Sequence, residues 1–398
     1  MIIILIIVAG LAGYVIGSSQ HTSVSALPLY TTTTQTVFTN SCVPPTCSST
    51  TETITRSVLN SNNSISNIIA DNMTVGPFPG RTGVNPVTDM VYIPYYNKQN
   101  SSIAVIDGRT NKVVATIANL QIPGTFLLVN SRTNMLYIGN LVINGSTNKV
   151  SASIESNMTF VALDESANLL FAVADNSSSS GLSSRLYEIN GTTNSVIDSQ
   201  TLTGYAQIGN GAVGEVALDN ITHAIYLPVC TVGFSCSPTY VYALYESGLE
   251  VVAKIPINQF AVFAIVVDDQ TNMIFVTASQ NLLIVINGTT NQIVGSVPIS
   301  AYANQLRNME IDPSMNELFI TGSPNCQDIL PDCGVGTLYV ISTQNYGLLA
   351  FFSTGKSGSE PIYLAFNPAN NETYMSFSYS DYVLAVKVPQ YQISILVP

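Results

Sequence analysis

The chain has 398 residues, of which 12 are basic and 24 acidic, giving a formal net charge of −12. This balance leaves no basic surface for nucleic acid and excludes that class of partner. Charged residues are only 9% of the chain, so Ser, Thr, Asn, Gln and Tyr must cover much of the surface. Such a surface changes little in charge as carboxylates protonate, and we expect the fold to tolerate acid.

The first sixteen residues form an uncharged apolar segment of the kind that targets a chain to a membrane. The segment is shorter than the roughly 20 apolar residues of a full membrane span. Val24-Ser25-Ala26 offers a small-residue cleavage site, but no Lys or Arg precedes the apolar run. Residues 1–26 are therefore either a cleaved signal peptide or a signal anchor retained through residues 2–16. Both alternatives predict export, to the cell surface or the extracellular space.

Residues 27–75 are rich in Thr and Ser, with runs at Thr31–Thr34 and Ser48–Thr51 around Pro44-Pro45. A segment so poor in bulky apolar residues cannot bury enough surface to fold alone. We expect a disordered stalk between the membrane segment and a folded head. Whether the stalk carries O-linked glycans or is a plain linker stays open at this point.

From residue 76 to residue 398 the chain repeats one pattern seven times. A strand-like run ends in a five-residue turn that begins with Asn or Asp, and an aromatic residue follows seven positions later. The turns begin at Asn85, Asn130, Asp164, Asp219, Asp268, Asp312 and Asn367, and the aromatic residues are Tyr92, Tyr137, Phe171, Tyr226, Phe275, Phe319 and Tyr374. The spacing is that of four-stranded propeller blades. The pattern predicts an all-β fold, a single seven-bladed β-propeller of antiparallel blades.

A second repeat reads Asp or Asn, Gly, any residue, Thr, Asn. It occurs at residues 107–111, 144–148, 190–194 and 287–291. Asn-Gly and Asp-Gly between apolar runs indicate tight hairpins, with the dipeptide supplying a positive φ. We place these hairpins between the third and fourth strands and assign Tyr391–Val397 as the fourth strand of blade seven. Whether a segment near Ile65–Met73 also joins that blade is left open.

These repeats resemble the YVTN family of propeller repeats, found in secreted and surface-layer-associated proteins. The best match is Val105–Ile117, which is similar to that family's third strand, turn and fourth strand. The resemblance implies a propeller over roughly residues 80–398 and a secreted or surface location, but no reaction. The naming tetrapeptide does not occur intact; the nearest forms are Phe275-Val276-Thr277-Ala278 and Tyr137-Ile138-Gly139-Asn140.

The six cysteines fall into three close pairs: Cys42 with Cys47, Cys230 with Cys236, and Cys326 with Cys333. An even count in local pairs on an exported chain predicts disulfides. Metal ligation is the competing interpretation, but the spacing is not Cys-x-x-Cys and no histidine is adjacent. Export also makes Asn-x-Ser/Thr sites candidates for glycosylation. We select Asn62, Asn72, Asn100, Asn157, Asn176, Asn220 and Asn371, while Asn144, Asn190 and Asn287 have a competing role in the hairpin repeat.

A search for catalytic groups finds little. Of the two histidines, His21 lies in the leader and His223 is the fifth residue of a repeat turn. We therefore assign no catalytic residue and no cofactor. Glu215 and Glu310, with Arg307 nearby, are weak candidates for holding a divalent metal at the channel, as in propeller lactonases. The bland interpretation is that they are solvated acids at strand ends.

We therefore expect a non-enzymatic binding or structural protein that presents a rigid disc to an envelope protein or a glycan. The alternative is an extracellular hydrolase or lactonase with a metal at the central channel. In this topology the two cysteine-closed insertions lie on one face, together with the variable loops that commonly carry function. On that face we predict Tyr205, Phe234 and Tyr240 as aromatic anchors for the partner.

Overall fold

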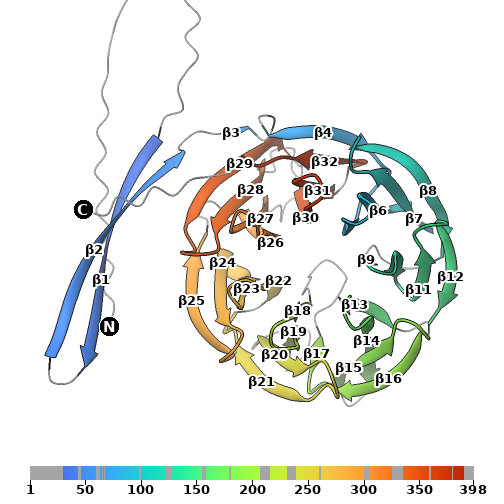
Figure 1. Cartoon of the computed structure of the whole chain (residues 1–398), viewed down its shortest axis with the longest axis horizontal. Helices are drawn as coiled ribbons and strands as arrows, with labels where there is room; N and C mark the ends of the chain where they lie inside the picture. Colours follow the sequence, from blue (N-terminus) through green and yellow to red (C-terminus); the bar gives the residue numbers. More distant parts are fainter. Residues whose placement is uncertain are drawn as a thin grey trace, which may run out of the picture.

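A computed structural model describes residues 30–43, 46–59, 63–64, 66, 68–97, 100–121, 127–154, 158–178, 181–206, 216–230, 239–259, 261–299, 304–324, 335–357, 360–378 and 380–389. Seven sheets stand around a central axis like the blades of a propeller (Figure 1). Within each blade the strands follow one another as antiparallel neighbours. The predicted fold class and the number of blades are therefore confirmed.

The first three blades are four-stranded meanders in chain order. Blade 1 contains β5 (Gly83–Asn85), β6 (Met90–Asn97), β7 (Asn100–Asp107) and β8 (Lys112–Leu120). Blade 2 contains β9 (Leu127–Asn130), β10 (Met135–Ile138), β11 (Leu141–Asn144) and β12 (Lys149–Ser153). Blade 3 contains β13 (Thr159–Asp164), β14 (Leu169–Ser178), β15 (Gly181–Asn190) and β16 (Ser195–Thr201).

Blade 4 differs in its inner strand, which is split into β17 (Tyr205–Ala206) and β18 (Ala217–Asp219). Both pieces pair with β19 (Ala224–Cys230), and β20 (Thr239–Tyr245) and β21 (Val251–Pro256) complete the blade. Blade 5 contains β22 (Val262–Asp268), β23 (Met273–Ala278), the short 3₁₀ turn η2 (Ser279–Asn281), β24 (Leu282–Asn287) and β25 (Gln292–Pro298). Blade 6 contains β26 (Asn304–Asp312), β27 (Glu317–Pro324), β28 (Val335–Ser342) and β29 (Leu348–Ser357).

The ring is closed by a strand from the N-terminal side. Blade 7 contains β30 (Glu360–Asn367), β31 (Glu372–Ser378) and β32 (Tyr382–Val386), and its outer strand is β4 (Ile69–Thr74). The expected fourth strand, 391–397, lies outside the described residues, and its place beside β32 is held by β4. The ring thus begins before residue 76. A further short strand, β3 (Asn63–Ser64), pairs in parallel with β29 of blade 6.

The seven aromatic residues of the first repeat hold equivalent positions, as predicted. Each is the third residue of the second strand of its blade, and each is at most 1% exposed: Tyr92, Tyr137, Phe171, Tyr226, Phe275, Phe319 and Tyr374. They belong to apolar clusters that join side chains of neighbouring blades. Burying so large a side chain at every junction makes these residues a main source of the packing between sheets.

The chemistry of the first turn explains why Asn and Asp recur in it. The side-chain oxygen of the first residue accepts backbone N–H groups two and three residues later; Asn85 Oδ1 accepts from Val87 N and Thr88 N. The fifth residue is in the left-handed conformation in all seven blades, with φ from 52° to 59°. Asn tolerates that conformation better than other side chains, and it or Asp holds the position in every blade except blade 4.

The hairpins of the second repeat are present, but the reason given for their glycine was wrong. The positive φ lies on the final Asn, at 54° to 55° in Asn111, Asn148, Asn194 and Asn291, and not on the glycine. The glycine is required by close packing instead. A Cβ at Gly145 would lie 2.6 Å from Asn134 Oδ1, and one at Gly191 would lie 2.5 Å from Asn168 Oδ1. Both of these Asn residues are the fifth residue of the blade's first turn.

The segment predicted to be a stalk contains an antiparallel hairpin, β1 (Tyr30–Val43) with β2 (Thr46–Leu59). Its register places Cys42 directly opposite Cys47. The leader lies outside the described residues, so the signal peptide or anchor stays a prediction. The role of the hairpin segment as a stalk also stays a prediction. Within the described part of the chain, helices long and apolar enough to span a membrane are absent.

Candidate functional site

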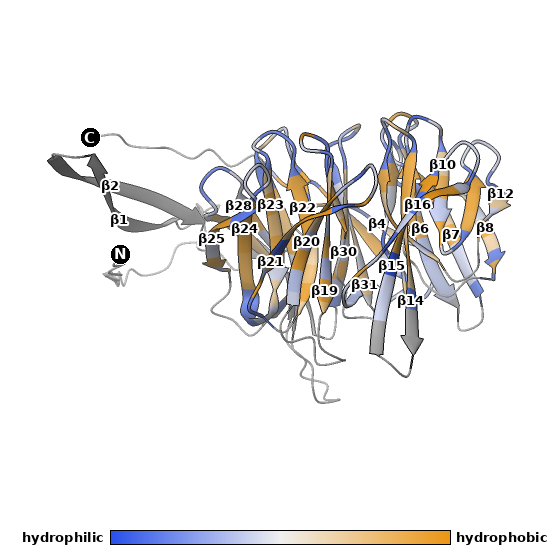
Figure 2. Cartoon of the chain, turned by 90° about the horizontal axis from the view of Figure 1, so that it is seen from below, coloured by the Kyte–Doolittle hydropathy of each residue, from blue (hydrophilic) through white to orange (hydrophobic). Residues whose placement is uncertain are grey.

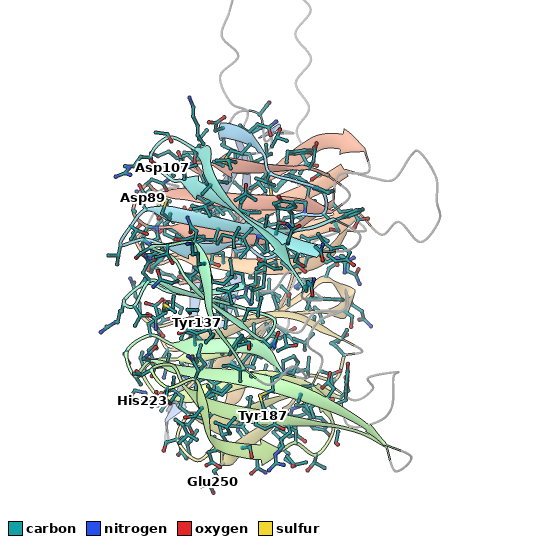
Figure 3. The ribbon with its side chains drawn as sticks, turned by 90° about the vertical axis from the view of Figure 1, so that its right-hand side faces the viewer. Asp89, Asp107, Tyr137, Tyr187, His223 and Glu250 are labelled. Carbon is teal, nitrogen blue, oxygen red and sulfur yellow. The ribbon has the colours of Figure 1, made fainter. Side chains whose placement is uncertain are left out.

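The propeller has two chemically different faces. One, which we call the turn face, carries the tight turns of the blades. The other, the loop face, carries the connections from second to third strands and from one blade to the next. The turns form the upper edge of the disc in Figure 2, and β14 points toward the opposite edge. Asp89 and His223, the fifth turn residues of blades 1 and 4, lie at the same edge in Figure 3.

On the turn face, side-chain hydrogen bonds connect neighbouring blades. The first turn residue of one blade contacts the fifth turn residue of the next, as where Asn85 Nδ2 donates to Asn134 Oδ1 over 2.8 Å. The bond recurs where Asn130 donates to Asn168 over 2.9 Å and where Asn367 donates to Asp89 over 2.7 Å. A third such bond, from Asn272 to Asp219 over 2.7 Å, forms when the Asn272 amide is oriented with its nitrogen toward Asp219. An amide can both donate and accept, which suits it to this position.

The junction between blades 3 and 4 departs from this pattern at two positions. His223 stands where other blades have Asn or Asp, and Glu246 occupies the place of the hairpin glycine, since its N–H donates to His223 O over 2.9 Å as Gly145 N donates to Asn134 O. The side chain of Glu246 is 7% exposed and that of His223 is 68% exposed. Glu246 hydrogen-bonds with Asp164, which is 3% exposed.

The electrostatics of this carboxyl pair are asymmetric. Burial, followed by the charge of Asp164, raises the pKa of Glu246 to about 7, although His223 opposes the rise. Burial also raises the pKa of Asp164, but hydrogen bonds from Ser166 and Ala167 outweigh it and leave that pKa lowered. From mildly acidic to neutral pH, therefore, Asp164 carries the charge and Glu246 holds a proton for part or all of the time.

A second polar cluster lies on the loop face between the same two blades. Ser184 Oγ of β15 donates to Asp175 Oδ1 of β14 over 2.5 Å and accepts from Ala206 N over 2.8 Å. Tyr205 of β17 also hydrogen-bonds with Asp175. The cluster thus joins two strands of blade 3 to the inner strand of blade 4. Although Asp175 is exposed as a residue, its carboxyl lies among protein atoms, which raises its pKa; the bonds from Ser184 and Tyr205 lower it in part.

The predicted aromatic anchors lie near this cluster. Tyr205 pairs with Cys230, and Tyr240 pairs with Val229, so both are at the loop-face end of blade 4. Tyr205 is half-buried. Tyr240 packs against the core between blades 3 and 4 and meets Tyr242 edge-to-face, with 6.4 Å between ring centroids. Tyr240 is therefore partly committed to packing. Phe234 lies outside the described residues.

Cys230 is buried at the end of β19 and is disulfide-bonded. Its predicted partner, Cys236, lies outside the described residues, as do Cys326 and Cys333. All three pairings thus stay predictions, including that of Cys42 with Cys47, which lie opposite each other in the hairpin.

Of the two weak metal candidates, the structure describes only one, so the metal site stays a prediction. Glu310 is half-buried on β26, opposite Phe319 of β27, whereas Glu215 lies outside the described residues. Arg307, on the same strand as Glu310, lies over the ring of Phe263 at 5.8 Å. Groups of three or more His, Cys, Asp or Glu able to hold a metal are absent from the part of the chain that the structure describes.

The candidate glycosylation sites fall in different environments. Asn72, Asn220 and Asn371 are exposed and Asn100 is half-buried; Asn62 and Asn157 lie outside the described residues, and Asn176 is described only as part of β14. Asn220 Nδ2 is engaged with Asp269 Oδ2 over 2.7 Å. Asn144 and Asn190 use their side-chain oxygens to accept two backbone N–H groups each, as the hairpin interpretation expects. Attachment of glycans stays a prediction at all of these positions.

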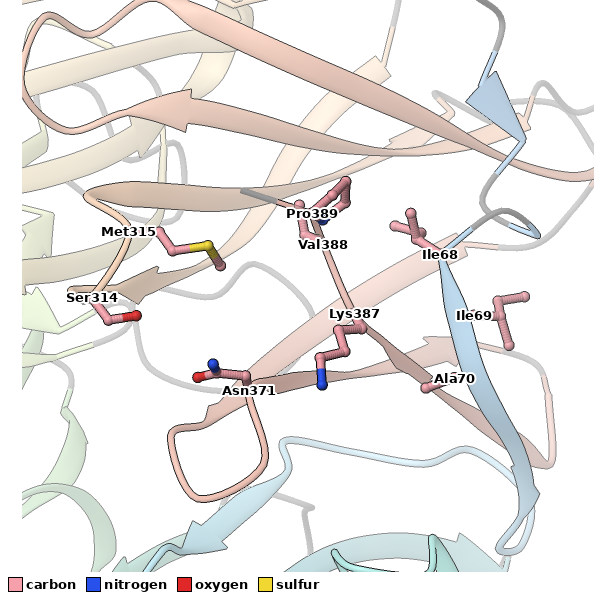
Figure 4. A pocket seen from close by; sticks show the side chains of 9 residues that line it. All are labelled: Ile68, Ile69, Ala70, Ser314, Met315, Asn371, Lys387, Val388 and Pro389. Carbon is pink, nitrogen blue, oxygen red and sulfur yellow. The ribbon is translucent and has the colours of Figure 1, made fainter. Parts of the chain in front are cut away.

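A cleft of about 690 Å³ opens on the turn face where the chain leaves blade 7 (Figure 4). In blade 7 the usual hairpin is missing, because β4 arrives from the N-terminal side. The walls are mostly aliphatic, with three polar side chains: Ile68, Ile69, Ala70, Ser314, Met315, Asn371, Lys387, Val388 and Pro389. Among the lining residues only Lys387 is ionisable, so the cleft offers a ligand mainly apolar contacts.

No family model matches this chain, and the search of curated proteins found no match. The resemblance to YVTN repeats therefore stays an interpretation of the repeat pattern. The repeat pattern predicted the place of His223 in its turn, but the carboxyl pair beside it was not predicted. The signal was available, because blade 4 alone among the clear repeats replaces both Asn at the fifth turn position and Gly in the hairpin.

Proposed function

We propose that this propeller is a non-enzymatic binding protein of the cell surface or extracellular space, which recognises a glycan on its loop face between blades 3 and 4. The observation that carries the proposal is the cluster of Asp175, Ser184 and Tyr205. The Asp175 carboxylate can accept hydrogen bonds from the hydroxyls of a saccharide, and the ring of Tyr205 supplies an apolar surface. Ser184 is buried, so it holds the Asp175 carboxyl in place and does not contact the ligand.

Export is part of the proposal and is supported by two observations. The apolar leader is of the targeting type, and Cys230 is disulfide-bonded, which fits an oxidising compartment. The YVTN-like repeats agree with such a location. N-terminal sequencing of the mature protein, together with protease accessibility on intact cells, tests export. An intracellular protein would contradict it.

The ligand is tested by screening the purified, full-length protein against a glycan array and measuring hits by calorimetry. We expect Tyr205→Phe and Asp175→Asn to weaken binding at least about tenfold, because each removes a hydrogen bond to the ligand or misplaces its neighbour. Tyr245→Phe is the matched control, since Tyr245 is exposed on the turn face of the same blade. Equal affinities of all three variants would overturn the site. Absence of any glycan ligand, with capture of a defined envelope protein, would replace the glycan by a protein partner.

A further inference from the structure

The contact between blades 3 and 4 on the turn face requires a proton, whereas the four amide contacts described above for other junctions do not. At the regular junctions an amide donates to an Asn or Asp oxygen, and an amide keeps its hydrogens at every pH at which the protein folds. At this junction both partners, Asp164 and Glu246, are carboxyl groups. A bond between them exists only while one of them is protonated.

Steric constraints explain why the amide is absent. At the regular hairpins a side chain in place of glycine would collide with the fifth turn residue, as the contacts of Gly145 and Gly191 show. Because Glu246 does carry a side chain there, the fifth residue cannot point inward. His223 accordingly faces solvent, with its Nδ1 3.7 Å from Glu246 Oε2. The two replacements in blade 4 therefore form one unit.

The hydrogen bonds around the two carboxyl groups indicate which of them holds the proton. Asp164 Oδ1 already accepts from Ser166 N over 2.7 Å, Ser166 Oγ over 2.7 Å and Ala167 N over 3.0 Å, all of which favour its ionised form. No described group donates to Glu246 Oε1, which is buried. Ionised, Glu246 would leave that oxygen unsatisfied beside a second negative charge; protonated, it can donate to Asp164.

The remaining ionisable groups around the pair favour the same assignment. Glu188 of β15 is buried and accepts from Gly248 N of the same hairpin as Glu246; burial and the charge of Asp198 raise its pKa, and the bond from Gly248 lowers it in part. His223 is the nearby basic group, and its effect is to lower the pKa of Glu246 in part. The other ionisable groups named here, Asp164, Glu188 and Asp198, are carboxyl groups.

We propose that the Asp164–Glu246 carboxyl pair is a proton-dependent contact between blades 3 and 4, which strengthens the ring in acid and weakens it above neutral pH. The sign follows from linkage. A carboxyl group whose pKa is raised on folding contributes stability that is complete below its ordinary pKa, near 4.5, and is lost as the pH rises through about 7. This behaviour is independent of whether the loop face binds a glycan.

The test is thermal unfolding of the full-length protein from pH 5 to pH 9, with hydrogen exchange of the Glu246 amide measured in parallel. We expect the wild-type melting temperature to fall above neutral pH and the protection of that amide to decrease at least about tenfold. Glu246→Gln keeps a donor at every pH, so it should remove most of this fall. Glu250→Gln, an exposed residue next to the same hairpin, is the matched control and should retain it.

Two further variants keep the proposal falsifiable if Glu246→Gln folds poorly. Asp164→Asn supplies a donor to ionised Glu246 and should move the pH dependence to lower pH. The double variant Glu246→Gly with His223→Asn rebuilds the regular junction and should abolish the dependence. Retention of the wild-type pH profile in any folded variant of these three would overturn the proposal.

Discussion

The junction between blades 1 and 2 and the junction between blades 3 and 4 perform the same structural task with different chemistry. The first uses two amides, Asn85 and Asn134, above a hairpin whose glycine leaves room for them. The second uses two carboxyl groups, Asp164 and Glu246, with the histidine turned outward. The comparison shows that one repeat can exchange a contact indifferent to pH for one that depends on a proton.

The comparison is tested most severely by moving the carboxyl group into a regular junction. Gly288→Glu would bring a side chain against the Asn272 amide and a second negative charge close to Asp219, since a Cβ at this position lies 2.7 Å from Asp219 Oδ2. Because Asn272 stays inward, we expect a loss of about 3 to 5 kcal/mol in the free energy of unfolding at pH 8. Urea denaturation at pH 5 and pH 8 measures it.

The same experiment has an internal check. Adding Asn272→His to Gly288→Glu copies both replacements of blade 4 and should recover part of the lost stability, more at pH 5 than at pH 8. If the double variant is no more stable than the single one at either pH, the outward histidine is not what admits the carboxyl group.

Breaking a regular junction should also lower the free energy of unfolding, but by the same amount at every pH. Asn85 is fully buried, and Asn85→Ala would leave Val87 N and Thr88 N without their acceptor and Asn134 without its donor. We expect a loss of about 2 kcal/mol. Chemical denaturation at pH 5 and pH 8 should give the same loss within error. A clear difference between the two pH values would mean that the amide junction also depends on pH.

The smallest effect is expected at a junction where only a hydroxyl is removed. Tyr374 Oη donates to Asn111 Oδ1 over 2.8 Å and accepts from Asn370 Nδ2 over 3.0 Å. Phe occupies the equivalent position in blades 3, 5 and 6, so Tyr374→Phe should preserve the packing. We expect a loss of about 1 kcal/mol, measurable as a lower urea midpoint with an unchanged slope. A loss as large as that of Asn85→Ala would mean that the phenol positions the turn.

The sequence by itself determined the architecture. The position of Asn or Asp before each turn and of the aromatic residue seven positions later indicated the number of blades, because these are local requirements: an oxygen that accepts the turn's own N–H groups, and a large side chain between sheets. Asn at the fifth turn position follows from the left-handed φ that the turn requires there, which is also a local requirement.

Only the tertiary structure decided the contacts that join residues far apart in the chain. The sequence suggested that the hairpin glycine is needed for a positive φ. In the structure it is needed because a side chain there would collide with the Asn of a different turn. The outer strand of blade 7 is β4, which comes from the N-terminal side of the chain and pairs with β32. This pairing joins residues that are far apart in the sequence. In the same way, the proton on Glu246 depends on Asp164, 82 positions earlier in the chain, and on burial that exists only when blades 3 and 4 meet.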